Sequence, residues 1–152
     1  MKNDLMAPGP SVRAVILDDD RLILFRRTVP GRPLYWSAPG GHVEPGDATL
    51  EDTLRREMLE ELGATVGGVT PLVTLSYPSG DGVKVQHVYG CRLLTMDLAL
   101  RCGPEFRDPA SGVYEVVRLP LAPEEIAGIN LVPGELRDYL ARTITDLPAL
   151  IP

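Results

Sequence analysis

The sequence is poor in cysteine and aromatic residues and has no long apolar run. Two cysteines in 152 residues do not make a disulfide framework, and Cys91 and Cys102 lack the paired spacing of a zinc site. We interpret both as structural. No apolar run approaches the roughly 20 residues that span a bilayer, and the first residues lack the apolar stretch of a secretory signal. We therefore expect a cytoplasmic protein with no membrane partner.

Positive charge is also scarce. Fifteen lysines and arginines face 21 aspartates and glutamates, for a formal net charge of −6. Binding to a nucleic-acid duplex depends on neutralising phosphates, so this balance argues against a general duplex-binding surface. A polyphosphate can still bind where divalent cations and a few local arginines offset its charge. The expected partner is therefore a small nucleotide-like anion.

Length and composition are typical of one compact domain. A chain of 152 residues can bury a single core, and 44% hydrophobic with 24% charged residues is an ordinary globular balance. We expect a flexible N-terminal leader over residues 1–11, a single domain over 12–145, and a C-terminal tail over 146–152.

Short apolar runs separated by turn residues predict a sheet. Strands are expected over 12–17 and 22–25, and the acidic turn at 18–20 joins them into a hairpin. Further strands are predicted over 69–77, 83–96 and 113–119, with a terminal helix over 133–145. Because strands outnumber helices and helices flank them in sequence, we expect an α/β fold of the α+β type, with a mixed sheet covered by helices.

The clearest helix lies between Thr49 and Gly63. Thr49 followed by Asp52 resembles a capping box, and Gly63 is well placed as the C-terminal stop. A buried row is predicted from apolar residues that recur every four positions: Leu50, Leu54, Met58 and Leu62.

Three carboxylates share another face of this helix. At about 100° per residue, Glu57, Glu60 and Glu61 cover an arc of roughly 100°, where they repel one another. A hard divalent cation such as Mg²⁺ would convert that repulsion into coordination, and Arg56 is placed to brace Glu60. Such an acidic run alone is typical of a solvated helix face. The glycine-rich string PGGHVEPGD just before it favours a metal site instead, because it delivers backbone groups beside the carboxylates.

Together these segments resemble the signature of the Nudix (MutT-like) hydrolase family, which is Gly, five residues, Glu, seven residues, then Arg-Glu-apolar-x-Glu-Glu-x-Gly-apolar. Gly41 opens the pattern and residues 56–64, REMLEELGA, complete it. Asp47 stands where the signature has glutamate, and eight residues rather than seven separate it from Arg56. We expect the extra residue to fall in the loop before the helix, which leaves the ligands in phase. The flanking segments RAVIL, LILFRR, YWSAPGGHVE, GPEF and VYEVVRLPL resemble those of such domains as well.

The resemblance implies an α/β/α sandwich with a mixed sheet. It also implies Mg²⁺-dependent hydrolysis, with Mn²⁺ as a substitute, of a nucleoside diphosphate linked to another moiety, such as a nucleoside triphosphate or a nucleotide sugar. The implied metal ligands are Gly40 through its carbonyl, Glu57, Glu60 and Glu61. Glu57 is our first choice for the general base, and Arg56, Glu57 and Glu60 form the expected catalytic set.

Three further residues are candidates through the same resemblance. Glu105 matches a position where relatives often supply an acidic ligand or base, although it could equally be an ordinary surface glutamate. Arg27 matches a position that often contacts substrate phosphate, with a plain surface charge as the alternative. Arg26 should face the other side of the same strand, so we expect only one of the two arginines to bind substrate.

The sequence disfavours two other functions. A nucleotide-sensing module without activity usually loses the Arg-Glu or Glu-Glu residues, and all of them are present here. Isomerase chemistry on an isoprenoid diphosphate needs an acid/base cysteine in a setting that neither Cys91 nor Cys102 has. Tyr77 and Pro78 come too early to count as substrate markers, so the substrate and the formation of a homodimer stay open.

Overall fold

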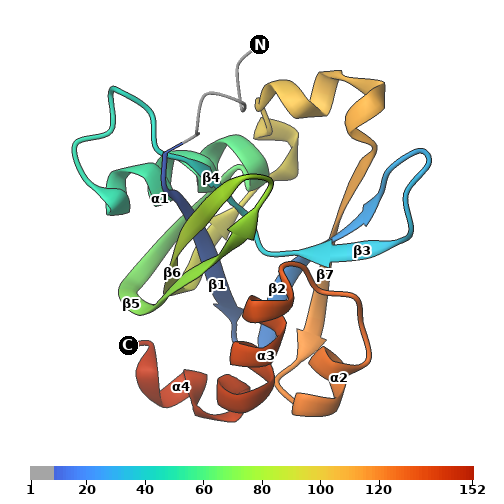
Figure 1. Cartoon of the computed structure of the whole chain (residues 1–152). Helices are drawn as coiled ribbons and strands as arrows, with labels where there is room; N and C mark the ends of the chain where they lie inside the picture. Colours follow the sequence, from blue (N-terminus) through green and yellow to red (C-terminus); the bar gives the residue numbers. More distant parts are fainter. Residues whose placement is uncertain (1–8) are drawn as a thin grey trace.

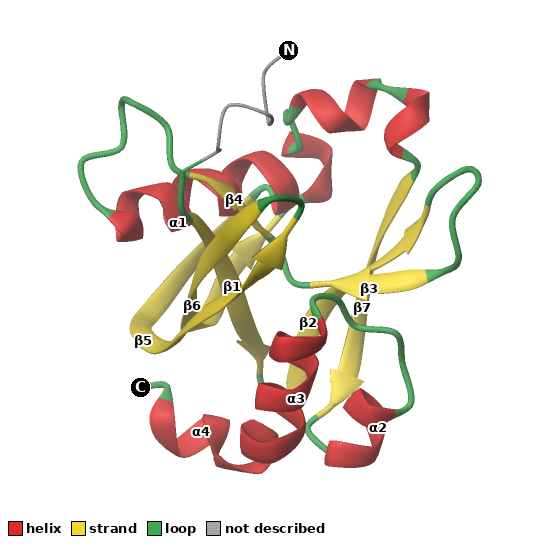
Figure 2. Cartoon of the chain, in the orientation of Figure 1, coloured by secondary structure: helices red, strands yellow, loops and turns green. Residues whose placement is uncertain are grey.

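The protein, described here over residues 9–152 of a computed structural model, is a seven-stranded mixed sheet with helices on both faces (Figures 1 and 2). The strands are β1 (Ser11–Asp18), β2 (Arg21–Thr28), β3 (Tyr35–Ser37), β4 (Gly40–His42), β5 (Ala64–Ser79), β6 (Gly82–Met96) and β7 (Val113–Pro120). The helices are α1 (Leu50–Leu62), α2 (Pro123–Ala127), α3 (Gly134–Thr143) and α4 (Leu147–Leu150). Four short 3₁₀ turns are η2 (Leu98–Leu100), η3 (Pro104–Arg107), η4 (Pro109–Ser111) and η5 (Ile144–Asp146).

The strand order is β3-β2-β1-β6-β5, with β4 also pairing with β1 and β7 with β2. Strands β1 and β6 run parallel, whereas the other pairs are antiparallel, which confirms the expected mixed sheet. The hairpin of β1 and β2 is also confirmed, with Ile16 opposite Ile23.

Alternation along β1 divides the core into two layers. Val15 and Leu17 pack with Leu136 and Leu140 of α3, whereas Ile16 faces the other way, toward α1. The sheet is therefore sandwiched between α1 and the C-terminal helices, as the packing argument from sequence required. No helix in the described range, 9–152, is long and apolar enough to cross a membrane.

The chain ends differ from the expected leader and tail. Residues 1–8 of the leader lie outside the described residues, and Ser11 already begins β1 and is fully buried. Residues 147–150 of the expected tail form α4, and Leu147 and Ile151 are buried in the core beside α3. The segment that the sequence suggested was a tail is therefore part of the packed domain.

The caps of α1 are those expected. The Thr49 hydroxyl accepts a hydrogen bond from the Asp52 N–H at 3.1 Å, and Gly63 ends the helix in the left-handed conformation at φ 58°. Three members of the predicted apolar row are fully buried, namely Leu54, Met58 and Leu62. Burying this row fixes the rotation of α1 and thereby directs its carboxylates toward β4.

Candidate active site

Two glycines let β4 lie close to β1 on one side and to Glu57 of α1 on the other. Gly40 adopts φ +155°, and a Cβ atom there would collide with the carbonyl oxygen of Val12. A Cβ atom at Gly41 would collide with the carboxylate of Glu57. Any larger residue at either position would therefore displace β1 or Glu57.

Two of the three predicted helix ligands point toward Gly40 and Gly41, which we call the glycine turn. The Gly40 N–H donates to Glu61 Oε1 at 2.7 Å, and the Glu57 carboxylate lies against Gly41. Glu57 and Glu61 are only 8% and 6% exposed. The carboxylates of α1 are thus held at the inner side of the glycine turn.

Burial makes these carboxylates weak acids. It is the main reason that the pKa of Glu57 is raised to about 7 and that of Glu61 to about 8, and the negative charge of Glu105 contributes to both values. The negative charge of Glu60 also raises the pKa of Glu57, and that of Glu57 raises the pKa of Glu61. Carboxylates from two separate segments therefore repel one another here, and a divalent cation would relieve that repulsion.

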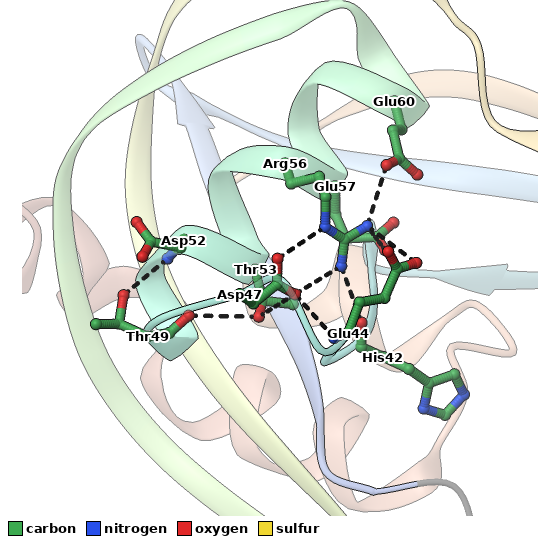
Figure 3. Close-up of polar contacts among 9 residues, drawn as sticks. All are labelled: His42, Glu44, Asp47, Thr49, Asp52, Thr53, Arg56, Glu57 and Glu60. Carbon is green, nitrogen blue, oxygen red and sulfur yellow. Dashed lines mark hydrogen bonds and ion pairs between the residues drawn. The ribbon is translucent and has the colours of Figure 1, made fainter.

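Arg56 connects the helix carboxylates to the preceding loop (Figure 3). Its guanidinium donates to both oxygens of Asp47, at 3.0 and 2.9 Å, and to the His42 carbonyl oxygen at 3.1 Å. It also donates to Glu57 at 3.0 Å and Glu60 at 3.1 Å. A single side chain therefore sets the position of two predicted ligands relative to the turn.

Asp47 is the other half of this brace. Beyond its two bonds from Arg56, its carboxylate accepts the Thr53 hydroxyl at 2.8 Å and the Glu44 N–H at 2.9 Å (Figure 3). These donors, Arg56 first, hold the pKa of Asp47 well below its usual range. Glu44 also forms a longer ion pair with Arg56, at 3.4 Å. The aspartate and the extra loop residue leave the brace complete.

The segment between β6 and β7 brings Glu105 to the same place. The N–H groups of Cys102 and Gly103 donate to the Glu60 carbonyl oxygen at 3.0 and 3.3 Å, which places the segment beside the end of α1. Glu105 follows in η3, and its charge reaches Glu57 and Glu61. The Glu105 carboxylate lies against Gly103, at the end of α1, and acts on the helix carboxylates through its charge.

The two adjacent arginines of β2 are separated. Arg27 is 8% exposed and stacks on Tyr114, with its guanidinium carbon 3.4 Å from the ring centroid. It donates to the carbonyl oxygens of Ser111 and Val113. Tyr114 in turn feels the charges of Arg27, Glu105 and Glu61, although burial is the main reason that its pKa is raised. Arg27 thus stacks on a residue that packs in the same core layer as α1.

Arg26 points to the other face of β2. It pairs with Glu115 at 3.1 Å and lies 6.0 Å from the Trp36 ring centroid. Its side chain is 42% exposed. The two arginines therefore lie on opposite faces of the sheet, as the alternation predicted.

The donor set suits a hard cation. Carboxylates of Glu57, Glu60, Glu61 and Glu105 offer oxygen ligands only, as Mg²⁺ prefers. Among residues 9–152, no three His, Cys, Asp or Glu side chains converge in an arrangement that could already hold a metal ion. Arg56 and the Gly40 N–H each engage one oxygen of these helix carboxylates, so a cation would bind through their second oxygens once the side chains draw together.

The cysteines and His87 have no place in this group. Burial raises the pKa of Cys91 to about 12, which suits a structural thiol. Cys102 is exposed, although its backbone joins the segment to α1. His87 lies on β6, where its Nδ1 is 3.3 Å from the Thr74 hydroxyl.

Arg13 and Tyr114 were not predicted from the sequence. Arg13 donates to the Ala38 carbonyl oxygen at 3.1 Å, and its positive charge lowers the pKa of Glu61 against the larger effect of burial. A charged residue inside the apolar run of β1 was the available signal for it. Tyr114 carried no comparable signal, because its place beside Arg27 depends on the pairing of β2 with β7.

Known proteins resemble the chain in sequence and in fold. The family described as NUDIX domain matches residues 7–133. The U8 snoRNA-decapping enzyme of Bos taurus is 32% identical over 160 residues, which cover 97% of this chain and 80% of that protein.

Solved structures add the fold alone, since their identities are low. A NUDIX hydrolase from Nitrosomonas europaea aligns with TM-score 0.71 at 17% identity, over 95% of this chain and 93% of its own. An ADP compounds hydrolase aligns with TM-score 0.71 at 22% identity, over 93% and 75%.

Proposed function

The chain belongs to the Nudix family of hydrolases, and from that premise we propose that it cleaves a phosphoanhydride bond in a nucleoside diphosphate linked to another moiety. Mg²⁺ would be held by Glu57, Glu60 and Glu61 of α1, with Glu105 and the Gly40 carbonyl as further ligands. The products would be a nucleoside monophosphate and a second product that keeps the other phosphate.

One observation carries this proposal, namely the brace between Asp47 and Arg56. Two side-chain bonds to Asp47 and one to each of Glu57 and Glu60 fix the carboxylates relative to the glycine turn. A domain that only packs around a solvated helix has no need of buried, mutually repelling carboxylates held in this way. A site that must receive a cation and a polyphosphate does.

The side chains suggest how the work is divided. Bound Mg²⁺ would neutralise phosphate oxygens and make the attacking water more acidic. Glu57 is our candidate for accepting the proton of that water, because its carboxylate lies against the glycine turn beside the other proposed ligands. Arg56 keeps Glu57 and Glu60 in place, and Arg27 is our candidate for orienting a substrate phosphate.

The proposal extends to the class of substrate. Nucleoside triphosphates and nucleotide sugars fit the reaction, and the name of the bovine relative adds capped RNA to the substrates worth assaying. The net charge of −6 favours a small nucleotide over a long nucleic acid.

A first prediction tests reaction class and metal site together. We expect at least one member of a nucleotide panel to be hydrolysed with Mg²⁺ and left intact with chelator. Glu60→Gln should remove most of this turnover and leave the circular dichroism spectrum unchanged, because it deletes a ligand charge without touching the core.

Glu51→Gln is the matched control. Glu51 lies on the same helix but pairs with Arg55, at 2.8 Å, and should be nearly silent. Full activity in Glu60→Gln would disprove the metal assignment. A wild-type protein that binds nucleotides without turning any over would favour the sensing module.

A further inference from the structure

The segment 97–112 caps the C-terminal end of α1. Besides the Cys102 and Gly103 amides on Glu60, the Asp97 N–H donates to the Gly63 carbonyl oxygen at 3.0 Å. The last carbonyls of a helix have no partners within it, so this segment supplies them from outside. The segment that carries Glu105 is thereby attached to the helix that carries the other carboxylates (Figure 1).

Arg101 adds a bridge to this cap. Its Nε donates to the Glu61 carbonyl oxygen at 2.7 Å, and its NH2 group donates to the Tyr114 carbonyl oxygen at 3.0 Å. The last turn of α1 reads Leu-Glu-Glu-Leu, so the positive charge favoured at a helix C-terminus comes from Arg101 instead. One guanidinium therefore joins α1, the segment and β7.

Aromatic rings fix the plane of this guanidinium. Its central carbon lies 4.6 Å from the ring centroid of Phe106 and 5.6 Å from that of Phe25. Phe106 directly follows Glu105, and its ring also packs edge-on against Tyr114 at 5.0 Å. Contact with Arg101 thus restrains η3, the turn from which Glu105 faces the site.

Charge supports the same assignment. Burial lowers the pKa of Arg101, while the negative charges of Glu61 and Glu105 act in the opposite direction. Arg101 is therefore close enough to both carboxylates to offset part of their repulsion. The Arg101 side chain thus both links these segments and supplies a positive charge beside the carboxylates.

We propose that Arg101 is a positioning residue that holds Glu105 against the carboxylates of α1 by bridging the Glu61 and Tyr114 carbonyls. This inference rests on the proposed function, because it assigns Arg101 a role in assembling that metal site. Arg101 would touch neither metal nor substrate.

Binding of Mn²⁺ to the free protein, followed by electron paramagnetic resonance, tests the proposal without substrate. Arg101→Met should weaken Mn²⁺ binding and lower kcat, each by about 10- to 100-fold, the usual range for residues that orient metal ligands. KM should change much less.

Arg92→Met is the matched control. Arg92 also donates to main-chain carbonyls, those of Pro148, Ile151 and Pro152. These bonds hold the C-terminal segment and not the segment that carries Glu105. It should keep wild-type Mn²⁺ affinity and kcat even if it lowers the melting temperature. Equal losses of Mn²⁺ affinity in the two variants would reduce Arg101 to a structural residue and overturn the proposal.

A double variant tests whether Arg101 acts through Glu105. In a Glu105→Gln background, Arg101→Met should add little further loss of kcat or Mn²⁺ affinity, whereas multiplicative losses would overturn the proposal. Arg101→Lys keeps the charge without the fork and serves if the methionine variant fails to fold. We expect it to lose part of the affinity, and wild-type behaviour would also overturn the bridge.

The two hypotheses fail in different ways. A wild-type protein with no chelator-sensitive turnover would refute the proposed function. A wild-type protein that is active, is inactivated by Glu60→Gln and is unaffected by Arg101→Met would refute only the role of Arg101.

Discussion

Asp47 is one methylene shorter than the glutamate of the family signature, yet both of its oxygens reach Arg56. The same carboxylate also accepts the Glu44 N–H from the loop before it and the Thr53 hydroxyl from α1. The brace is therefore complete despite both departures from the signature.

Asp47→Asn should lower kcat about tenfold or more, in line with other residues that orient metal ligands. The amide keeps the size of the side chain but places an N–H₂ group against a guanidinium that can only donate. Glu44→Gln provides the comparison. The Glu44 side chain is 59% exposed and its ion pair with Arg56 is long, at 3.4 Å, so this substitution should cost little activity. Equal losses in the two variants would contradict the assigned roles.

The same substitution predicts a pH dependence of stability. A carboxyl group whose folded-state pKa is depressed adds stability above its unfolded pKa of about 4, and that stability disappears as pH falls toward the folded value. The wild type should therefore have the higher denaturation midpoint at neutral pH, and its difference from Asp47→Asn should shrink below about pH 4. A difference that stays constant into acid would contradict this linkage.

Gly41→Ala should lower kcat by about tenfold or more, because a misplacement of about 1 Å in a catalytic group has effects of that order. The new methyl group would collide with the Glu57 carboxylate and turn it from its present position. Gly46 lies in the same loop, and a Cβ atom there meets none of the described residues within 4 Å. Gly46→Ala should therefore keep kcat, and identical kinetics in both variants would contradict a steric effect on Glu57.

At the level of elements, α1 could be predicted because its signals are local. The Thr49 cap, the Gly63 stop and the four-residue apolar repeat all lie within one segment, and the structure reproduces each of them. The carboxylates of the helix followed from the same phase. Local chemistry therefore sufficed for the part of the site that one helix provides.

Other elements depend on distant partners and left no comparable pattern. Strands β3 and β4 have three residues each, too few for a hydrophobic period, and exist because they pair with β2 and β1. Arg101 looked like an ordinary loop arginine, since its two acceptors lie 40 and 13 residues away. Such roles arise only when the sheet brings the segments together.

The alternation of β2 yields a paired prediction for Arg27 and Arg26. Arg27→Ala should raise KM more than it lowers kcat, because Arg27 stacks on Tyr114 on the face of the sheet that α1 covers and would bind substrate phosphate in ground and transition state alike. Arg26→Ala should change neither, since its side chain lies on the other face of the strand. Steady-state kinetics on the best substrate would compare them, and a larger effect of Arg26→Ala would reverse the assignment.

For the molecule as a whole, burying carboxylates at the site lowers the free energy of unfolding. Glu61 is 6% exposed and lies between α1 and β4, where burial raises its pKa to about 8. An acid with a raised folded-state pKa destabilises the fold as pH rises toward and through that value. Core packing on both faces of the sheet must offset this cost whenever no cation is bound.

Glu61→Gln should therefore have effects of opposite sign with and without metal. At about pH 8.5 without Mg²⁺, it should raise the melting temperature, because the amide removes a buried charge and can still accept the Gly40 N–H. Mg²⁺ at about 100 times its Kd should stabilise the wild type by about 2.7 kcal/mol and the variant much less. Glu51→Gln, on the exposed face of the same helix, should respond to Mg²⁺ like the wild type. A destabilised Glu61→Gln, or one that Mg²⁺ stabilises fully, would mean that the buried carboxylate serves the fold and not a cation.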